Sequence, residues 1–234
     1  MSPRKGIENR LLAALPKNEY KRLHPALKPV RFPGGHVLCE AREKLRYVYF
    51  PSGGMAALHA VGKEGYAFIG TVGNEGFIGD SIISGVLQTT CRVVVQFPLE
   101  EVRVPAAPLL AEFKRQGKLW ELLLGYKSVR FTQIVQAAVC NRFHSVSQRL
   151  CRVLLATGEC LHSDSLTLTH ESIAKVLANS RGSIGQAAKD LQKRGLIAYH
   201  RGDLRILDRK GLERGSCECH RIIGDCRKRA LGLD

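Results

Sequence analysis

The sequence predicts an α+β fold in which an N-terminal antiparallel β-roll, a long helix and a C-terminal helical domain follow one another. Eleven of the 23 glycines lie between Gly34 and Gly85, among short runs of β-prone residues. Residues 108–157 contain only two glycines and are rich in Leu, Ala, Gln and Lys, which is typical of helices. Residues 168–197 then hold two short helical patterns separated by a turn.

The composition is that of an ordinary globular protein. The chain has 234 residues, of which 44% are hydrophobic and 24% charged, and this excludes disordered and fibrous classes. No apolar run approaches the ~18 residues of a membrane span. The apolar stretch Leu11–Leu15 is shorter than a signal-peptide core, so we expect a cytoplasmic protein. The eight cysteines do not indicate a disulfide framework, because the chain is long enough to bury its own core.

The first half of the chain predicts a helical lead-in over residues 7–27, interrupted by Pro16, and then a roll. Turns are expected at Pro51–Gly54 and at Gly62–Gly65, where Gly, Pro and Ser cluster. Strands separated by such turns every 8–12 residues are typical of an antiparallel sandwich or jelly-roll-like fold. The expected strands are Arg46–Phe50, Met55–Val61, Tyr66–Val72, Arg92–Phe97 and Glu101–Val104.

A long helix with its hinge is predicted over residues 114–143. Apolar side chains recur there at a spacing of three to four residues, which is helical. We expect this stripe to form the seam of a dimer, with packing along the roll as the alternative. The predicted seam residues are Leu119, Leu123, Tyr126, Arg130, Gln133 and Ala137. Ser145 is expected to cap the helix that follows.

The two helical patterns after residue 168 predict a helix-turn-helix. Thr169 is the expected N-cap of the first helix, Ala178-Asn179 the turn, and Ser180 the N-cap of the second helix. The second helix presents Arg181 and Gln186, which can hydrogen-bond guanine and adenine in a major groove.

A two-stranded wing is expected after Gly195. Residues 196–200 and 204–207 alternate between apolar and polar, with a turn at Arg201–Asp203. The wing carries Arg201 and Arg205, whose side chains suit contacts with phosphates.

The formal net charge of +15 favours a polyanionic partner, either nucleic acid or an anionic membrane surface. Residues 175–210 hold nine basic and three acidic side chains, a net charge of +6. This window coincides with the helix-turn-helix and its wing, which favours DNA over a membrane. The alternative is an ordinary helical hairpin with a basic, solvated face.

The order of roll, long helix and winged helix-turn-helix resembles the Crp/Fnr family of bacterial transcription regulators. The residues that carry this resemblance are Leu168–Ile197, the opening Asn9–Pro16, the joint Cys140–Leu150 and the tail Cys217–His220. It implies a cyclic-nucleotide-binding-like β-roll sensor domain over residues 1–113, a dimerisation helix over 114–143 and a winged helix-turn-helix domain with a helical tail over 144–234.

The resemblance also implies a homodimer on a palindromic operator in double-stranded DNA, and RNA polymerase as a partner if the protein activates transcription. It assigns base reading to Arg181, Gly182 and Gln186. The family often has an acidic reader where this chain has Gly182, so the operator should differ at that base. Expected contacts to the DNA backbone come from Thr169, Ser180, Ser183, Lys189, Arg201 and Arg205. No membrane partner is expected.

Rolls of this family often bind a cyclic nucleotide, but the residues here depart from the family pattern. Asp80 stands where the family has a glutamate for the ribose, and Arg92 is displaced and followed by Val93 instead of Ser or Thr. A buried cyclic phosphate needs a cation and hydrogen-bond donors together. We therefore expect no cofactor and disfavour cyclic AMP. The effector pocket, if one exists, is expected at Gly79, Asp80, Thr90 and Arg92.

The remaining candidate chemistry is weaker. Cys217, Cys219, His220 and Cys226 are candidate metal ligands, but they lack paired C-x2-C spacing, so we expect small buried residues and no metal. The family's N-terminal iron–sulfur cysteines are absent, and lone histidines do not argue for haem. Nucleophile elbows, phosphate loops and zinc-protease motifs are absent as well, so an enzyme is not expected. A regulatory module acting on a protein partner is a third alternative, which leaves the wing unexplained.

Overall fold

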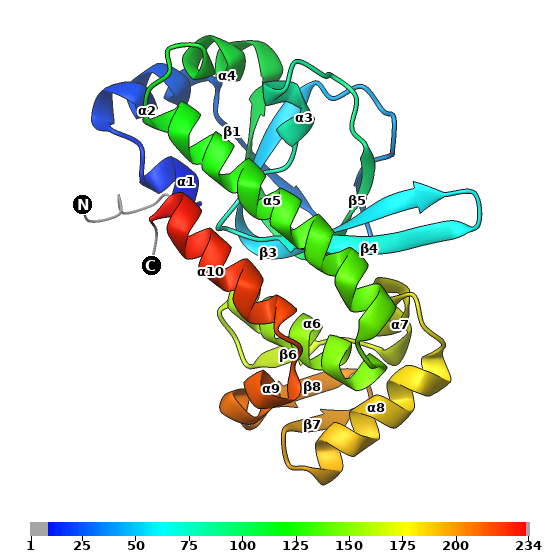
Figure 1. The fold of residues 1–234 in the computed structure, drawn as a ribbon. Coiled ribbons are helices and arrows are strands. Elements are labelled where there is room, and N and C mark those ends of the chain that lie inside the picture. Colours follow the sequence, from blue (N-terminus) through cyan, green and yellow to red (C-terminus); the bar gives the residue numbers. More distant parts are fainter. Residues whose placement is uncertain (1–8, 233–234) are drawn as a thin grey trace.

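The computed structural model describes residues 9–232, so the residues 7–8 of the expected lead-in lie outside the described part. A β-roll at one end is connected by the long helix α5 (Lys118–Phe143) to a smaller domain at the other end (Figure 1). The last helix, α10 (Cys219–Leu231), runs back alongside α5 (Figure 1). Within residues 9–232, none of the helices combines the length and hydrophobicity that a membrane crossing needs.

The lead-in folds into α1 (Arg10–Ala13), α2 (Lys17–Leu23) and the 3-10 turn η1 (His24–Ala26), and Pro16 separates the first two as predicted. Asn9 fixes the start of α1, because its side-chain oxygen accepts hydrogen bonds from the backbone N–H groups of Leu11 and Leu12. Its amide donates to the carbonyls of Pro51 and Gly76, at 2.8 and 2.9 Å. The lead-in is thereby tied to the roll.

The roll is an antiparallel sheet in the order β1-β5-β3-β4, with β2 also paired to β5. Its members are β1 (Lys28–Phe32), β2 (Val37–Cys39), β3 (Tyr47–Gly62), β4 (Gly65–Val72) and β5 (Cys91–Pro105), and the short helix α3 (Asp80–Ile83) lies between β4 and β5. The expected turn at Gly62–Gly65 is present and connects β3 to β4.

The prediction of a turn at Pro51–Gly54 is wrong. β3 runs through these residues as one strand, and the register against β5 shifts there instead. Gly54 has φ 78°, and a Cβ at this position would lie 2.0 Å from the carbonyl oxygen of Pro98. The glycines therefore permit a bulge with close backbone approach, not a reversal. The runs 92–97 and 101–104 likewise belong to one long strand, β5.

Helix α5 begins at Lys118, four residues after the expected start, and ends at Phe143 as predicted. Residues 114–117 instead close α4 (Ala106–Phe113) and turn the chain, with Gln116 in the left-handed region at φ 54°. The buried carboxylate of Glu19 accepts the first two N–H groups of α5, both at 2.9 Å, and thereby caps the helix.

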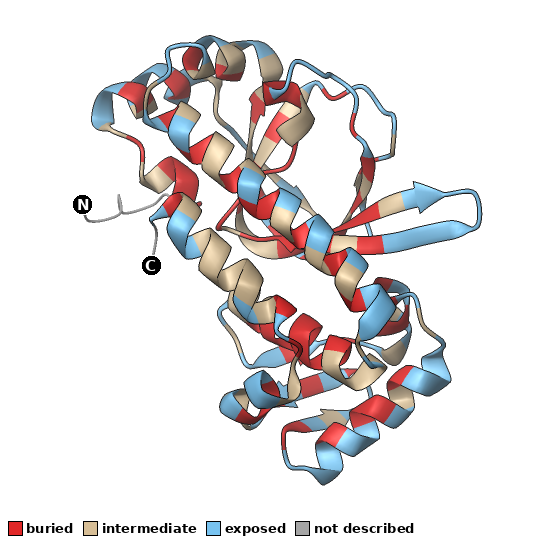
Figure 2. Cartoon of the chain, viewed as in Figure 1, coloured by how far each residue is buried: buried red, intermediate tan, exposed pale blue. Residues whose placement is uncertain are grey.

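The six residues predicted to form the dimer seam do not face outward, so this choice of residues is wrong. Leu119, Leu123, Tyr126, Arg130, Gln133 and Ala137 are all buried within the chain itself (Figure 2). This face packs along the roll, which is the alternative that the sequence left open. Leu119, Leu123 and Tyr126 join the core of the roll, and Gln133 donates a hydrogen bond to the carbonyl of Thr71 in β4. Side chains buried within one chain are unavailable to a second copy.

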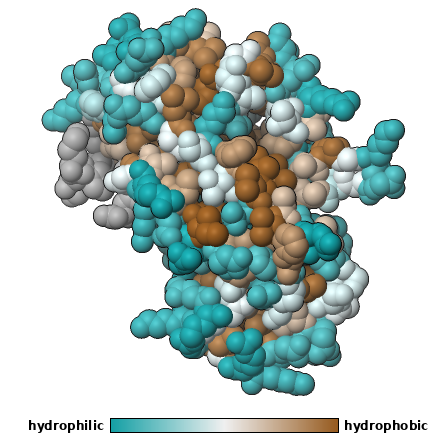
Figure 3. Space-filling view, in the orientation of Figure 1, coloured by the Kyte–Doolittle hydropathy of each residue, from teal (hydrophilic) through white to brown (hydrophobic). Residues whose placement is uncertain are grey.

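A different apolar stripe of α5 is exposed. Phe131 is 68% exposed, and Ile134 and Val135 are each 42% exposed. The hydropathy surface shows this apolar patch over α5, next to a second one over α10 (Figure 3). The spacing of three to four residues places the three side chains on one face of the helix.

The C-terminal domain consists of α6 (Val146–Leu161), α7 (His170–Leu177), α8 (Arg181–Lys193), α9 (Arg209–Gly215) and a three-stranded sheet. The sheet has the order β6-β8-β7, with β6 (Ser165–Thr167), β7 (Ile197–His200) and β8 (Asp203–Ile206). Ser145 caps α6 as predicted, in a reciprocal capping box with Gln148. The strand β6 was not expected from the sequence.

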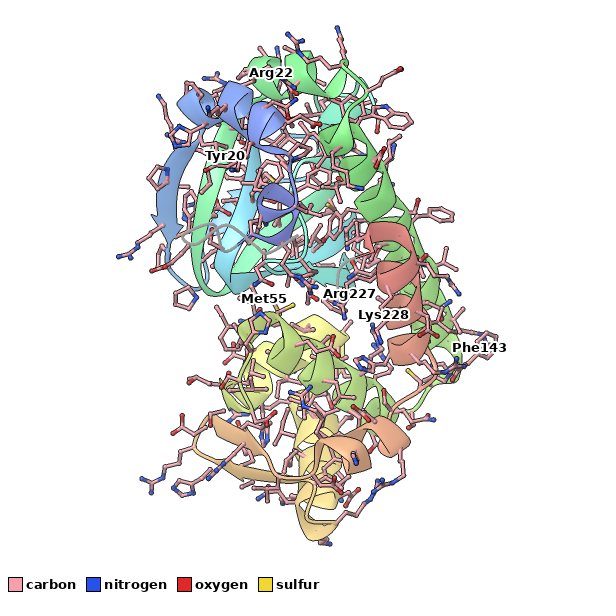
Figure 4. All side chains as sticks on the ribbon, turned by 90° about the vertical axis from the view of Figure 1, so that its left-hand side faces the viewer. Tyr20, Arg22, Met55, Phe143, Arg227 and Lys228 are labelled. Atoms are coloured by element: carbon pink, nitrogen blue, oxygen red, sulfur yellow. The ribbon has the colours of Figure 1, made fainter. Side chains whose placement is uncertain are left out.

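The roll and the C-terminal domain share an apolar core. Met55, Phe68 and Phe97 are buried among side chains of the C-terminal domain rather than in the centre of the roll. Met55 lies at the end of the roll that faces α6 (Figure 4). This packing fixes how the C-terminal domain sits against the roll.

Candidate nucleic-acid interface

The helix-turn-helix is built as the sequence predicts. Thr169 caps α7 by accepting the N–H of Ser172 at 3.1 Å, and Ser180 caps α8 by accepting the N–H of Ser183 at 3.1 Å. Apolar side chains of the two helices are buried against each other and against α6, namely Ile173, Val176, Leu177, Ile184, Ala187, Ala188 and Leu191.

The turn between the helices lies at Ala178-Asn179 as predicted, and it also depends on Arg149, which sequence reasoning did not connect with it. Ala178 ends α7 in the left-handed region at φ 48°, where glycine is the usual residue. The carbonyl of Leu177 accepts a hydrogen bond from Asn179 Nδ2 at 2.9 Å and another from the buried guanidinium of Arg149 in α6. Arg149 therefore ties the turn to the rest of the domain.

The outer face of α8 presents the predicted base readers to solvent. Arg181, Gly182 and Gln186 are all exposed, as is Lys189 one turn further along (Figure 2). Gln186 Nε2 donates to Asp190 Oδ1 at 3.0 Å, an intrahelical contact that a base edge can replace. A Cβ at Gly182 would meet only Ser180 Oγ, at 3.8 Å, so larger side chains fit there.

The wing is a tight hairpin next to α7. Its loop has two residues, one fewer than expected, because Asp203 pairs with His200 inside the ladder. Arg201 and Gly202 have φ of 47° and 97°, the conformation of a two-residue I′ turn. The carbonyl of Gly202 accepts the N–H of Leu168 at 2.7 Å, which holds the wing tip beside Thr169.

The predicted backbone-contacting residues are exposed as a set. They are Thr169, Ser180, Ser183, Lys189, Arg201 and Arg205. Together with the three base readers they lie at the start of α7, on α8 and on the wing. Helix α7 lies next to β4, whereas α8 and the wing form the end of the molecule farthest from the roll (Figure 1). This end has a largely hydrophilic surface (Figure 3).

The electrostatics of this surface act on His170. Burial is the largest cause that lowers the pKa of His170, and the positive charges of Arg181 and Lys189 lower it further. Burial and two cations of the candidate interface thus act together to disfavour the charged form of the imidazole. A positive field of this kind favours a polyanion.

The four residues expected for an effector pocket are not grouped as predicted. Asp80 is half-buried at the start of α3, and Cys91 is buried at the start of β5. Arg92 is the next residue along the strand and faces the other way. Gly79 precedes α3, and Thr90 is exposed before β5 begins.

Arg92 lies in the cavity between the roll and α7. It pairs with Glu40, with Nε and Oε1 3.3 Å apart, and its guanidinium lies 4.8 Å from the ring centre of Tyr66. It lines a cavity of about 580 Å³ between the roll and α7, together with His59 and Tyr66. Arg92 is thus occupied by contacts with Glu40 and Tyr66.

The candidate metal ligands are also divided. Cys217 and Cys219 are buried beside two residues from the end of α5 that the sequence spacing did not connect with them, Cys140 and His144. His220 instead pairs with Glu159, and Cys226 contacts Thr132. A separation of more than seventy residues in the chain hid this cluster.

Residues 148–215 match the Crp-like helix-turn-helix domain family. This segment is similar to Crp-like helix-turn-helix domains. It contains α7, α8 and the wing, and so all nine of the predicted DNA-contacting residues. No curated protein sequence matches the chain.

Solved structures of Crp/Fnr regulators have a similar fold over most of the chain. A protein from Eubacterium rectale assigned to the transcriptional regulators of the Crp/Fnr family is 19% identical, with a TM-score of 0.68, over 91% of this chain and 98% of that one. FixK2 from Bradyrhizobium japonicum is 11% identical, with a TM-score of 0.70, over 82% and 98%. The c-di-GMP responsive global regulator CLP of Xanthomonas campestris is 15% identical, with a TM-score of 0.68, over 82% and 100%.

Proposed function

We propose that this protein is a sequence-specific DNA-binding transcription regulator and not an enzyme. The observation that carries the proposal is the outer face of α8, where Arg181 and Gln186 are exposed beside the open position Gly182. Arginine can donate two hydrogen bonds to guanine and glutamine can pair with adenine in the major groove. The Crp-like domain match and the fold of the structural relatives support the same conclusion.

Contacts with the DNA backbone are proposed at the N-termini of α7 and α8 and along the wing. The N-termini of α7 and α8 offer backbone N–H groups next to the hydroxyls of Thr169 and Ser180, which suits a phosphate. Arg201 and Arg205 extend the contact along the wing, where they are exposed. Such contacts position the protein on the duplex, and α8 reads the bases.

The functional form is a homodimer formed through α5. Its seam is the exposed stripe of Phe131, Ile134 and Val135, because the opposite face of the helix is occupied by the roll. Two copies related by a twofold axis would place two α8 helices ~34 Å apart, in successive major grooves of a palindromic operator. A partner such as RNA polymerase enters if the regulator is an activator.

The roll is proposed to respond to something other than cyclic AMP. The one cation of the expected cassette, Arg92, lies on the outer face of β5 and pairs with Glu40. The buried guanidinium of Arg130 donates a hydrogen bond to Gln133. A buried cyclic phosphate needs a cation and hydrogen-bond donors together, and the two arginines nearest the expected cassette already bind other residues of the chain.

Selection of bound duplexes from a random DNA pool, with and without cyclic AMP, tests the proposal. We expect a palindromic sequence with half-sites one helical turn apart, and the same sequence in both arms. If no sequence is enriched and the protein still binds other proteins through its roll, the chain acts as a regulatory module on a protein partner. Enrichment only when cyclic AMP is present would overturn the part of the proposal that concerns the effector.

A further inference from the structure

Three thiols and an imidazole meet where the long helix ends. Cys140 lies in the last turn of α5, and His144 follows that helix directly. Cys217 lies in the segment between α9 and α10, and Cys219 is the first residue of α10. The Sγ atoms of Cys140 and Cys217 are 3.4 Å apart, and Cys219 Sγ is 3.6 Å from His144 Nδ1. All four candidate ligand atoms lie within 4.8 Å of one another.

The spacing in the chain explains how the four atoms converge. Residues four apart at the end of a helix lie on the same side, which brings Cys140 and His144 together. Cys217 and Cys219 flank Glu218, the N-cap residue of α10, and α10 packs along α5. The three sulfur atoms are buried, with 0%, 4% and 0% exposure for Cys140, Cys217 and Cys219.

The geometry fits a tetrahedral metal ion. Zinc–sulfur bonds of ~2.3 Å place the ligands of a tetrahedral zinc site roughly 3.8 Å from one another. The observed separations bracket that value, so an ion at the centre would require only small side-chain movements. Thiolates with one imidazole are soft ligands that select zinc over magnesium or calcium.

The surroundings also suit a metal ion. His144 directs Nδ1 to the cysteines and places Nε2 3.3 Å from the carboxylate of Glu218, which would orient the ring and leave Nδ1 free to bind. Three thiolates and one neutral imidazole around Zn²⁺ carry one net negative charge. The positive charge of Arg152 acts on the cluster thiols and would balance it, and Nε of this buried guanidinium has no hydrogen-bond partner among the described residues.

We propose that Cys140, His144, Cys217 and Cys219 bind one zinc ion. The ion joins the C-terminal end of α5 to the segment between α9 and α10, and so fixes the joint between the roll and the DNA-binding domain. The consequence for DNA binding rests on the proposed function, whereas metal binding itself does not. A disulfide between Cys140 and Cys217 would use two of the thiols and leave Cys219 and His144 without a role.

Cobalt titration of the purified full-length chain tests the proposal without any substitution. The protein is reduced, stripped of metal with a chelator and titrated with Co²⁺, which reports tetrahedral thiolate binding through its visible and near-ultraviolet absorption. We expect saturation at one Co²⁺ per chain and displacement of the cobalt by Zn²⁺. A reduced wild-type chain that gives no such absorption overturns the proposal, and so does a chain isolated with a Cys140–Cys217 disulfide that takes up no metal after reduction.

Matched variants then assign the ligands. Cys217→Ser should lose the absorption of a three-sulfur site, whereas Cys226→Ser and His220→Ala should titrate as the wild type does. Glu218→Gln, which keeps all four ligands, should weaken binding by about tenfold or more. Circular dichroism confirms that each variant is folded before titration. Equal loss in Cys226→Ser and Cys217→Ser would show that these four residues are not the site.

Discussion

His170 at the start of α7 stacks on Tyr199 in the wing, with ring centres 4.4 Å apart and planes 9° from parallel. The pair joins the helix-turn-helix to the hairpin beside it. Aromatic pairs of this kind contribute about 0.5–1.5 kcal/mol beyond the area they bury. We predict that Tyr199→Ala lets the wing open more often, so that backbone amides of β7 and β8 exchange hydrogen faster. Tyr199→Phe keeps the stack and should exchange as the wild type does, and equal exchange in all three proteins would contradict the role of the stack.

The wing tip offers a charge that can be removed without disturbing its turn. Arg201 has φ 47°, a region that asparagine tolerates better than most residues. We predict that Arg201→Asn preserves the fold and reduces the steepness with which DNA affinity falls with salt, by about 0.9 in the logarithmic slope for each phosphate that is no longer neutralised. Lys63→Asn removes a charge from the β3–β4 turn, which is not among the predicted DNA contacts, and should leave the slope unchanged. An unchanged slope in Arg201→Asn would remove the wing from the binding surface.

The exposed stripe of α5 is predicted to hold the dimer together. Phe131→Glu places a charge where the proposed seam would bury it, which costs several kcal/mol without a partner. Sedimentation velocity should therefore show a dimer for the wild type and a monomer for this variant. Val61→Glu, at another exposed apolar position, is the matched control and should remain dimeric. A dimeric Phe131→Glu protein would place the interface elsewhere.

Glu101 makes stability depend on pH. Burial, partly offset by Arg103, raises the pKa of its carboxyl from 4.5 to about 8. Its protonated form is therefore favoured in the folded chain, and this contribution to stability is lost as the pH rises through 8. Between about pH 6 and about pH 9 the wild type should lose about 2 kcal/mol of unfolding free energy that Glu101→Gln keeps. Denaturant unfolding at the two pH values measures the difference, and Glu100→Gln, an exposed neighbour, should behave as the wild type.

The sequence could predict what depends on local patterns. The caps at Ser145, Thr169 and Ser180, the helix-turn-helix and the end of α5 were all visible as residue types at fixed spacings. These features rely on neighbours in the chain, so one-dimensional spacing contains them.

The predictions that were wrong concerned which face of a helix or strand packs against the rest of the chain. The periodicity of α5 fits two apolar faces equally well, and only the position of the roll shows that Tyr126 lies inside and Phe131 outside. Gly54 reads as a turn residue, but the close approach of Pro98 makes it a bulge inside a strand. The cluster of Cys140 with Cys217 is likewise set by the packing of α10 on α5.

The affinity of Arg181→Ala for its selected operator, compared with its affinity for random DNA of the same length, tests the central claim most directly. The account predicts that the substitution weakens operator binding by about 1–3 kcal/mol per half-site while binding to random DNA changes little more than the removal of one charge would cause. A variant that binds the operator as tightly as the wild type, with the same preference over random DNA, would show that α8 does not read the bases through this residue.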